Sequence, residues 1–150
     1  MPHFGLMSTE DSFKTEEGAL LRAKLHIRSG KRRLRQGKVS AGMVTLYDAV
    51  SFAMRWYISS SERKSKLSIK DGENLNDDKT VFEILKRSGV MIDSDFDYLI
   101  LDQLVDRALE DEMAAYDYYG ILKSVESFMT TMGVMPFDEN ELPPEDPLTF

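Results

Sequence analysis

Apolar residues recur along the chain three and four positions apart, the spacing that places them on one side of a helix. Five such stretches are separated by glycines or by polar runs, and none shows the strict alternation of a half-buried strand. The pattern predicts an all-α domain, an up-and-down bundle of about five helices. The predicted helices run from Ser12 or Thr15 to Gly37, from Ser40 to Ile58, from Asn76 or Asp77 to Gly89, from near Ser94 to about Ala108, and from about Met113 to Met132.

The second of these stretches is apolar on almost every side. Ser40 can cap it, and apolar residues then fill five turns as far as Trp56. A helix with so broad an apolar surface packs against more than one neighbour, so we expect it at the centre of the bundle. The fourth helix is predicted to bury Phe96, Leu99, Ile100, Leu104, Val105 and Ala108, and the fifth Tyr116, Tyr119, Leu122, Val125, Phe128, Met129 and Met132.

The ends of the chain and one internal segment lack a helical pattern. Residues 1–11 are predicted to be a flexible arm, and residues 12–133 the helical domain. Residues 134–150 contain four of the five prolines and five carboxylates, which predicts a disordered, extended acidic tail. Residues 59–76 are polar enough to predict a long mobile connection.

The net charge of -7 hides a division of the chain into a basic and an acidic half. Residues 1–70 carry 14 Lys and Arg against 6 Asp and Glu, and residues 71–150 carry 5 against 20. A cationic cluster of this kind can attract nucleic acid through its phosphates. It can equally pair with the acidic half of the same chain or of a partner subunit. The candidate nucleic-acid patch comprises Lys31, Arg32, Arg33, Arg35 and Lys38.

The residue types present exclude several classes of site. The chain has no cysteine, which excludes disulfides and thiolate metal sites and is compatible with a cytoplasmic location. No apolar run is long enough to span a bilayer, so no membrane association is expected. The carboxylates Asp95, Asp102 and Asp106 fall at spacings of seven and four, so they can line one helix face, but the Glu-x-x-His pairs of di-metal bundles are absent. No nucleophile motif or phosphate-binding glycine loop is present, and we expect neither metal nor cofactor.

The hairpin from Leu20 to Ile58 resembles the first helical hairpin of HEPN domains. In that family, a helix rich in Ala, Lys and Arg ends in Leu-x-x-Gly, and a second helix carries small residues, Tyr, Ala-Val and a later Ala and Arg. The segment from Leu104 to Met129 is similar to the later family helices, in which an Arg precedes an aromatic element. The matching hairpin positions are Leu34, Gly37, Ala41, Tyr47, Ala49, Val50, Ala53 and Arg55.

The resemblance implies a fold and a choice of functions. Ribonucleases of the family use an Arg followed, four to six residues later, by a His. Arg107 stands at the Arg position, but Glu112, Met113 and Ala114 follow at that spacing. Arg107 is therefore carried over only as a phosphate contact, and its alternative is an ion pair with Asp111.

The resemblance without the His implies a non-catalytic binding or adaptor module. Such a module forms a homodimer and acts with a protein partner, for example a nucleotidyltransferase. Two alternatives stay open: an RNA-binding or RNA-processing protein that uses the basic first helix, and a structural bundle unrelated to HEPN domains. For the dimer, the candidate interface residues are Tyr47, Asp48, Arg55 and Trp56, whereas in a monomer Asp48 and Arg55 simply reach solvent.

Overall fold

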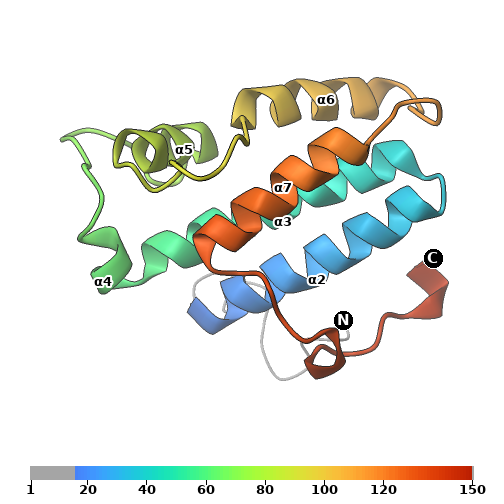
Figure 1. Cartoon of the computed structure of the whole chain (residues 1–150), viewed down its shortest axis with the longest axis horizontal. Coiled ribbons are helices and arrows are strands. Elements are labelled where there is room, and N and C mark those ends of the chain that lie inside the picture. Colours follow the sequence, from blue (N-terminus) through green and yellow to red (C-terminus); the bar gives the residue numbers. More distant parts are fainter. Residues whose placement is uncertain (1–15, 150) are drawn as a thin grey trace.

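The computed structural model describes residues 16–149, and every regular element among them is helical. The all-α prediction is therefore confirmed for this part of the chain. Five longer helices pack together, with one short helix between the second and third of them (Figure 1). The α-helices are α2 (Glu16–Arg35), α3 (Val39–Ser59), α4 (Ser61–Lys64), α5 (Asp78–Arg87), α6 (Tyr98–Glu110) and α7 (Tyr119–Met132), and two 3₁₀ helices follow, η1 (Glu139–Glu141) and η2 (Pro147–Thr149).

Helices α2 and α3 form a tight antiparallel hairpin. Gly37 ends α2 with a φ of 79°, the left-handed conformation that glycine adopts without strain. The helices then approach closely at Gly42, where an added Cβ would lie 2.6 Å from Leu34 Cδ2. This contact is possible only because the residue facing Leu34 has no side chain.

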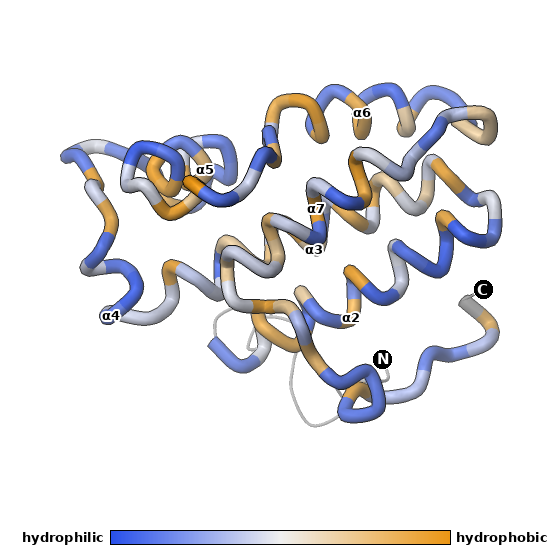
Figure 2. The backbone as a smooth tube through the Cα atoms, viewed as in Figure 1, coloured by the Kyte–Doolittle hydropathy of each residue, from blue (hydrophilic) through white to orange (hydrophobic). Residues whose placement is uncertain are grey.

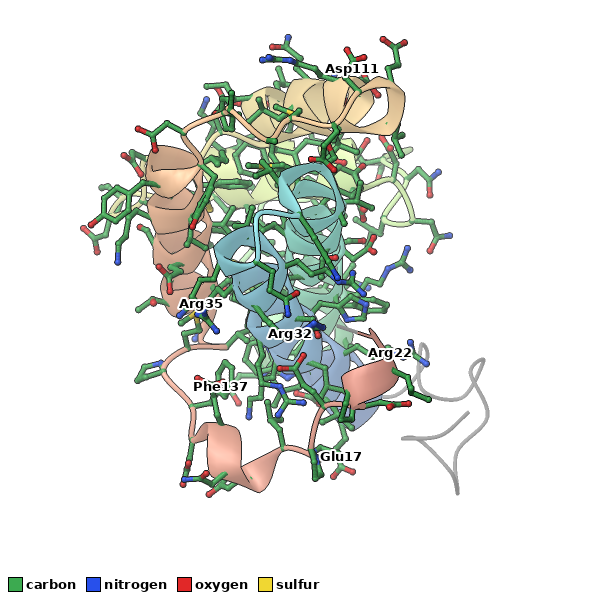
Figure 3. The ribbon with its side chains drawn as sticks, turned by 90° about the vertical axis from the view of Figure 1, so that its right-hand side faces the viewer. Glu17, Arg22, Arg32, Arg35, Asp111 and Phe137 are labelled. Atoms are coloured by element: carbon green, nitrogen blue, oxygen red, sulfur yellow. The ribbon has the colours of Figure 1, made fainter. Side chains whose placement is uncertain are left out.

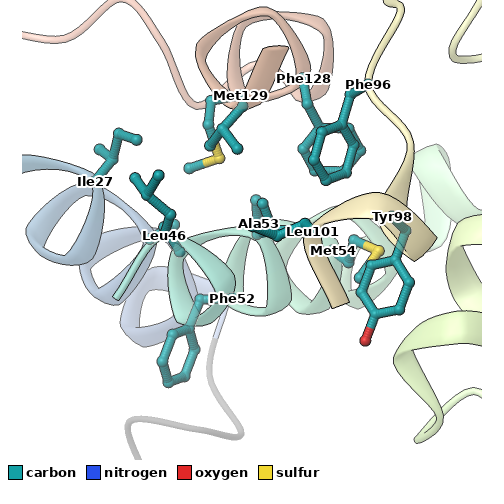
Figure 4. Close-up of a cluster of buried hydrophobic side chains, with 14 of the residues drawn as sticks. Ile27, Leu46, Phe52, Ala53, Met54, Phe96, Tyr98, Leu101, Phe128 and Met129 are labelled. Atoms are coloured by element: carbon teal, nitrogen blue, oxygen red, sulfur yellow. The ribbon is translucent and has the colours of Figure 1, made fainter. Parts of the chain in front are cut away.

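Helix α3 lies at the centre, as predicted, and contacts α2, α5, α6 and α7. Its buried side chains extend over almost its whole length. At one end of the core, four aromatic rings from three helices and a loop pack together, with Phe96 and Phe128 4.9 Å apart (Figure 4). Apolar residues line the inward faces of the helices, and hydrophilic residues dominate their outer faces (Figure 2). The four rings are those of Phe82, Phe96, Tyr98 and Phe128.

Two helices begin later than predicted. Helix α6 begins at Tyr98, because the carboxylate of Asp97 accepts the Leu99 N–H and so caps the first turn. Phe96 is buried ahead of the helix, but Leu99 and Ile100 point outward and are 40% and 52% exposed, so their predicted burial is wrong.

Helix α7 begins at Tyr119, and residues 113–118 form a turn. The Met113 N–H donates to Ser40 Oγ at the start of α3, which holds this turn against the hairpin instead of in a helix. Met113 is buried, whereas Tyr119 is 63% exposed, so the prediction that Tyr119 belongs to the core is wrong.

The connection over residues 59–76 is tied to its neighbours. It contains α4, which Ser60 caps by accepting the Arg63 N–H. Arg87 at the end of α5 donates to the carbonyl oxygen of Ser68 and forms an ion pair with Glu73 at 2.6 Å. These contacts fold the connection back onto α5.

The acidic tail lies against the bundle. Val134 is buried, Phe137 packs on the core, and residues 139–149 form the two 3₁₀ helices and the links around them. From there the tail runs along α2 towards the end of that helix (Figure 1). The prediction of a disordered tail is wrong for the described residues, because the tail carries the partners of two α2 arginines.

Candidate functional site

Three members of the predicted basic patch bind other parts of the same chain. Lys31 forms an ion pair with Glu126 of α7 at 2.9 Å, and Arg32 pairs with Glu145 of the tail at 2.8 Å. Arg33 donates to the Thr45 hydroxyl of α3 at 2.5 Å. For Lys31 and Arg32, the structure has the arrangement in which the basic half pairs with the acidic half of its own chain.

The remaining predicted cations are Arg35, Lys38 and Arg107, which lie at the same end of the molecule (Figure 1). Arg35 and Lys38 are exposed at the turn between α2 and α3, and Arg107 is exposed near the end of α6. Ser40 joins the two places, since its hydroxyl donates to the Asp111 carbonyl at 2.5 Å and its N–H donates to Glu112 Oε1 at 3.2 Å. Figure 1 shows this end of the molecule, with the hairpin turn below the end of α6.

Arg107 lines a cavity of about 450 Å³ beside the link between α6 and α7. Its guanidinium carbon lies 5.9 Å from the centre of the ring of Tyr116, which also lines the cavity. The contact with Asp111 is a backbone hydrogen bond, in which the Asp111 N–H donates to the Arg107 carbonyl. The charge of Arg107 therefore stays available to a ligand in this cavity, although Glu112 and Asp117 also line it.

The predicted interface residues make contacts within their own chain. The hydroxyl of Tyr47 shares a hydrogen bond with that of Tyr98 on α6. The Trp56 ring lies 3.9 Å from the guanidinium carbon of Arg63 on α4, a cation–π contact. Asp48 and Arg55 are half-buried on α3. The structure thus gives Tyr47 and Trp56 an intramolecular packing role that needs no second subunit.

A polar seam between α2 and α3 holds the only histidine in the described residues. His26 Nδ1 lies 2.7 Å from the Arg22 carbonyl oxygen, to which it donates in the neutral ring, and its ring packs 5.2 Å from Phe52. Burial lowers the pKa of His26, and the nearby Asp48 carboxylate opposes that shift. Burial also raises the pKa of Asp48, with His26 opposing it. Sequence reasoning passed over this pair because 22 positions separate the two residues in the chain.

A second feature that sequence reasoning missed is the contact between the tail and α2. Arg28, Ser29 and Arg32 all contact Glu145, which lies more than a hundred positions away in the chain. Figure 3 shows the tail, with Phe137, passing the side of α2 that carries Arg32. The only signal in the sequence was the opposite charge of the two segments, which indicates attraction but no particular pair.

The described residues contain no cluster of three or more His, Asp or Glu side chains that could hold a metal ion. Among the same residues, no helix combines the length and apolar character required to cross a membrane. No family model matches the chain, and neither a curated protein nor a solved structure matches it.

Proposed function

We propose that the protein is a non-catalytic, HEPN-like binding or adaptor module that forms a homodimer and acts with a protein partner, for example a nucleotidyltransferase. The HEPN part of the proposal comes from the resemblance of the hairpin from Leu20 to Ile58 and of the segment that contains Arg107. The binding part comes from the surface of α6.

Helix α6 carries apolar side chains on two sides. One side packs against α3 through Leu101 and Val105. Outside that side, Ile100 is 52% exposed and its neighbour Leu99 is 40% exposed at the start of the helix. Single exposed apolar residues are common, but Leu99 and Ile100 together form a surface that gains free energy when a partner covers it. This surface is the observation that carries the proposal.

Sedimentation velocity tests the dimer. The wild-type chain is expected at about twice the single-chain mass of 17.2 kDa. Ile100→Asp should convert it to the monomer, because the new carboxylate would lose its hydration in the interface. Ser61→Asp places the same charge at an exposed position of α4, away from this surface, and is the control. A monomeric wild type contradicts the homodimer, and a dimer that survives Ile100→Asp contradicts α6 as its surface.

The end of the molecule that carries Arg35, Lys38 and Arg107 favours one alternative, an RNA-binding protein. These three exposed cations could contact phosphates, and the Tyr116 ring beside Arg107 could stack on a base. Fluorescence anisotropy with single-stranded RNA, at about 50 and about 200 mM salt, separates the two functions.

Binding of RNA that weakens with salt, and that is abolished when Arg35, Lys38 and Arg107 are changed to Ala, would favour an RNA-binding protein over the adaptor module. Changing the exposed Lys64, Lys66 and Lys70 to Ala is the matched control, because it also removes three exposed cations, from α4 and the connection after it. Absence of RNA binding, together with a monomeric chain, would favour the third possibility, a structural bundle unrelated to HEPN domains.

A further inference from the structure

Three side chains on one face of α2 converge on a single carboxylate of the tail. Arg32 Nε donates to Glu145 Oε2 at 2.8 Å, and the Ser29 hydroxyl donates to the same oxygen at 3.3 Å. Arg28 Nε lies 3.8 Å from the other oxygen, Oε1. The arginine side chains are only 12% and 9% exposed. Because burying a guanidinium is costly without an anion beside it, this face is built around a bound carboxylate.

Arg28 also recognises the main chain of the tail. Its Nη2 donates to the Pro143 carbonyl oxygen at 2.7 Å. This face of α2 thus binds a peptide carbonyl and, two residues later in the tail, a carboxylate. A peptide offers both groups at this spacing, whereas a nucleic acid offers phosphates and bases. The pair of contacts favours an acidic peptide as the ligand.

The residues before the carboxylate fit the same mode of binding. Pro143 and Pro144 restrict the tail to an extended conformation, which lowers the entropy lost when such a segment binds. Leu142 precedes them and lines a cavity of about 210 Å³, in which Leu20 and Leu21 of α2 form the apolar wall. An apolar residue, two prolines and a glutamate therefore lie in order along α2.

The tail is held by few contacts beyond this point. Leu148 is 92% exposed, and most residues from 138 to 148 lie at the surface. A segment with little buried apolar area opens at a small fraction of the free energy of global unfolding. Detachment removes Glu145 from Arg28 and Ser29, so the open face favours another carboxylate.

We propose that this face of α2 (Arg28, Ser29 and Arg32) is a binding site for an acidic, proline-containing segment of a partner protein, which the chain's own tail occupies as a tethered competitor. The inference rests on the proposed function as a protein-binding module and names the chemistry of its partner. A short tether gives the tail an effective concentration of roughly millimolar, so a partner binds weakly until the tail is displaced.

The experiment uses the full chain and a fluorescein-labelled peptide with the sequence of residues 140–149, read by fluorescence anisotropy. Glu145→Lys places an ammonium against Arg28 and Arg32 and so displaces the tail. This variant is expected to bind the peptide at least about tenfold more tightly than the wild type. Glu141→Lys makes the same charge change at an exposed position of the tail and should behave as the wild type.

Two further probes identify the site and the ligand class. Arg28→Gln in the Glu145→Lys chain should cancel the gain, and Ser29→Ala should reduce it, with far-UV circular dichroism showing that each chain folds. A peptide with Gln at the position of Glu145 should bind more weakly than the labelled peptide. Equal affinity of Glu145→Lys and wild-type chains, or of the two peptides, overturns the proposal. A single-stranded RNA that displaces the peptide at lower concentration than unlabelled peptide does also overturns it.

The outcome is independent of the sedimentation test. If the chain is a dimer through α6 but its Glu145→Lys variant does not bind the peptide more tightly, the proposed site on α2 is contradicted and the proposed function stands. If the chain is a monomer but its Glu145→Lys variant binds the peptide more tightly, the site on α2 stands and the homodimer is contradicted.

Discussion

At the residue scale, Gly42 decides how closely α2 and α3 approach. A Cβ at this position would lie 2.6 Å from Leu34 Cδ2 and 3.3 Å from the Leu34 backbone nitrogen. Gly42→Ala must therefore move the helices apart or force Leu34 from its rotamer, which we expect to cost about 1–3 kcal/mol in the free energy of unfolding. Urea denaturation measures this loss.

Gly120→Ala is the matched control for that prediction. Gly120 is also helical, but nothing lies within 4 Å of the position of its Cβ. The added methyl group should leave stability unchanged or raise it by up to about 1 kcal/mol, because alanine loses less backbone entropy than glycine in a helix. Equal effects of the two changes would mean that Leu34 accommodates a side chain at Gly42.

At the same scale, titration of His26 should make the stability of the protein depend on pH. Burial lowers its pKa from the ordinary value of 6.5, so the unfolded chain takes up the proton more readily than the folded one. Stability due to neutral His26 is present above pH 6.5 and is lost as the pH falls through the lower pKa of the folded state. The raised pKa of Asp48 acts in the opposite direction, since protonation of that carboxyl favours the folded state.

Urea denaturation at about pH 7.5 and about pH 5.5 tests the effect of His26, because few other groups titrate between these values. We expect the wild type to be less stable at the lower pH. His26→Asn retains a donor for the Arg22 carbonyl but cannot take up a proton, so its loss of stability between the two conditions should be smaller. An unchanged difference would show that His26 does not govern this pH range.

At the scale of the element, Arg87 fastens the connection over residues 66–76 to α5. It binds the Ser68 carbonyl and both carboxylate oxygens of Glu73, whose pKa it lowers. Arg87→Ala should speed hydrogen exchange in residues 66–76, because local opening then breaks fewer bonds. Global stability should change little, since the pair is at the surface and screened by solvent. Lys86→Ala, at the exposed neighbouring position, should leave the exchange rates unchanged.

The helices themselves were largely predictable from the sequence, and the misplaced ends have local causes. Gly37, Gly89 and Gly133 all adopt positive φ where the apolar periodicity predicted an end. The start of α7 was wrong because Met113 and Tyr116 continue the helical spacing of apolar residues. Met113 is indeed buried, but its backbone binds Ser40, a contact across 73 positions that periodicity does not encode.

At the scale of the whole molecule, the two oppositely charged halves of the sequence lie against each other. Glu126 of α7 and Glu145 of the tail contact Lys31 and Arg32 of α2. Composition predicted this attraction, but the choice of partners depends on how α7 and the tail return to α2. For that reason the basic patch was predictable as a cluster, and the carboxylate site formed by Arg28 and Ser29 was not.

The aromatic cluster predicts how the molecule unfolds. Phe128 of α7 is fully buried and lies 4.9 Å from Phe96 and 6.4 Å from Phe82 of α5, so one side chain joins two peripheral helices and the loop before α6. Phe128→Ala should lower the free energy of unfolding by about 3–5 kcal/mol. Thr130→Ala, at an exposed position on the same helix, should change it by less than about 0.5 kcal/mol.

Two optical signals show whether that loss is shared by the whole domain. Trp56 is the only tryptophan and reports on α3, whereas far-UV circular dichroism reports on all helices. Because α3 contacts every longer helix, the two urea transitions should coincide in the wild type and shift together in Phe128→Ala. If circular dichroism is lost at lower urea than Trp56 fluorescence, α5 and α6 unfold as a separate unit and the aromatic cluster does not couple them to α3.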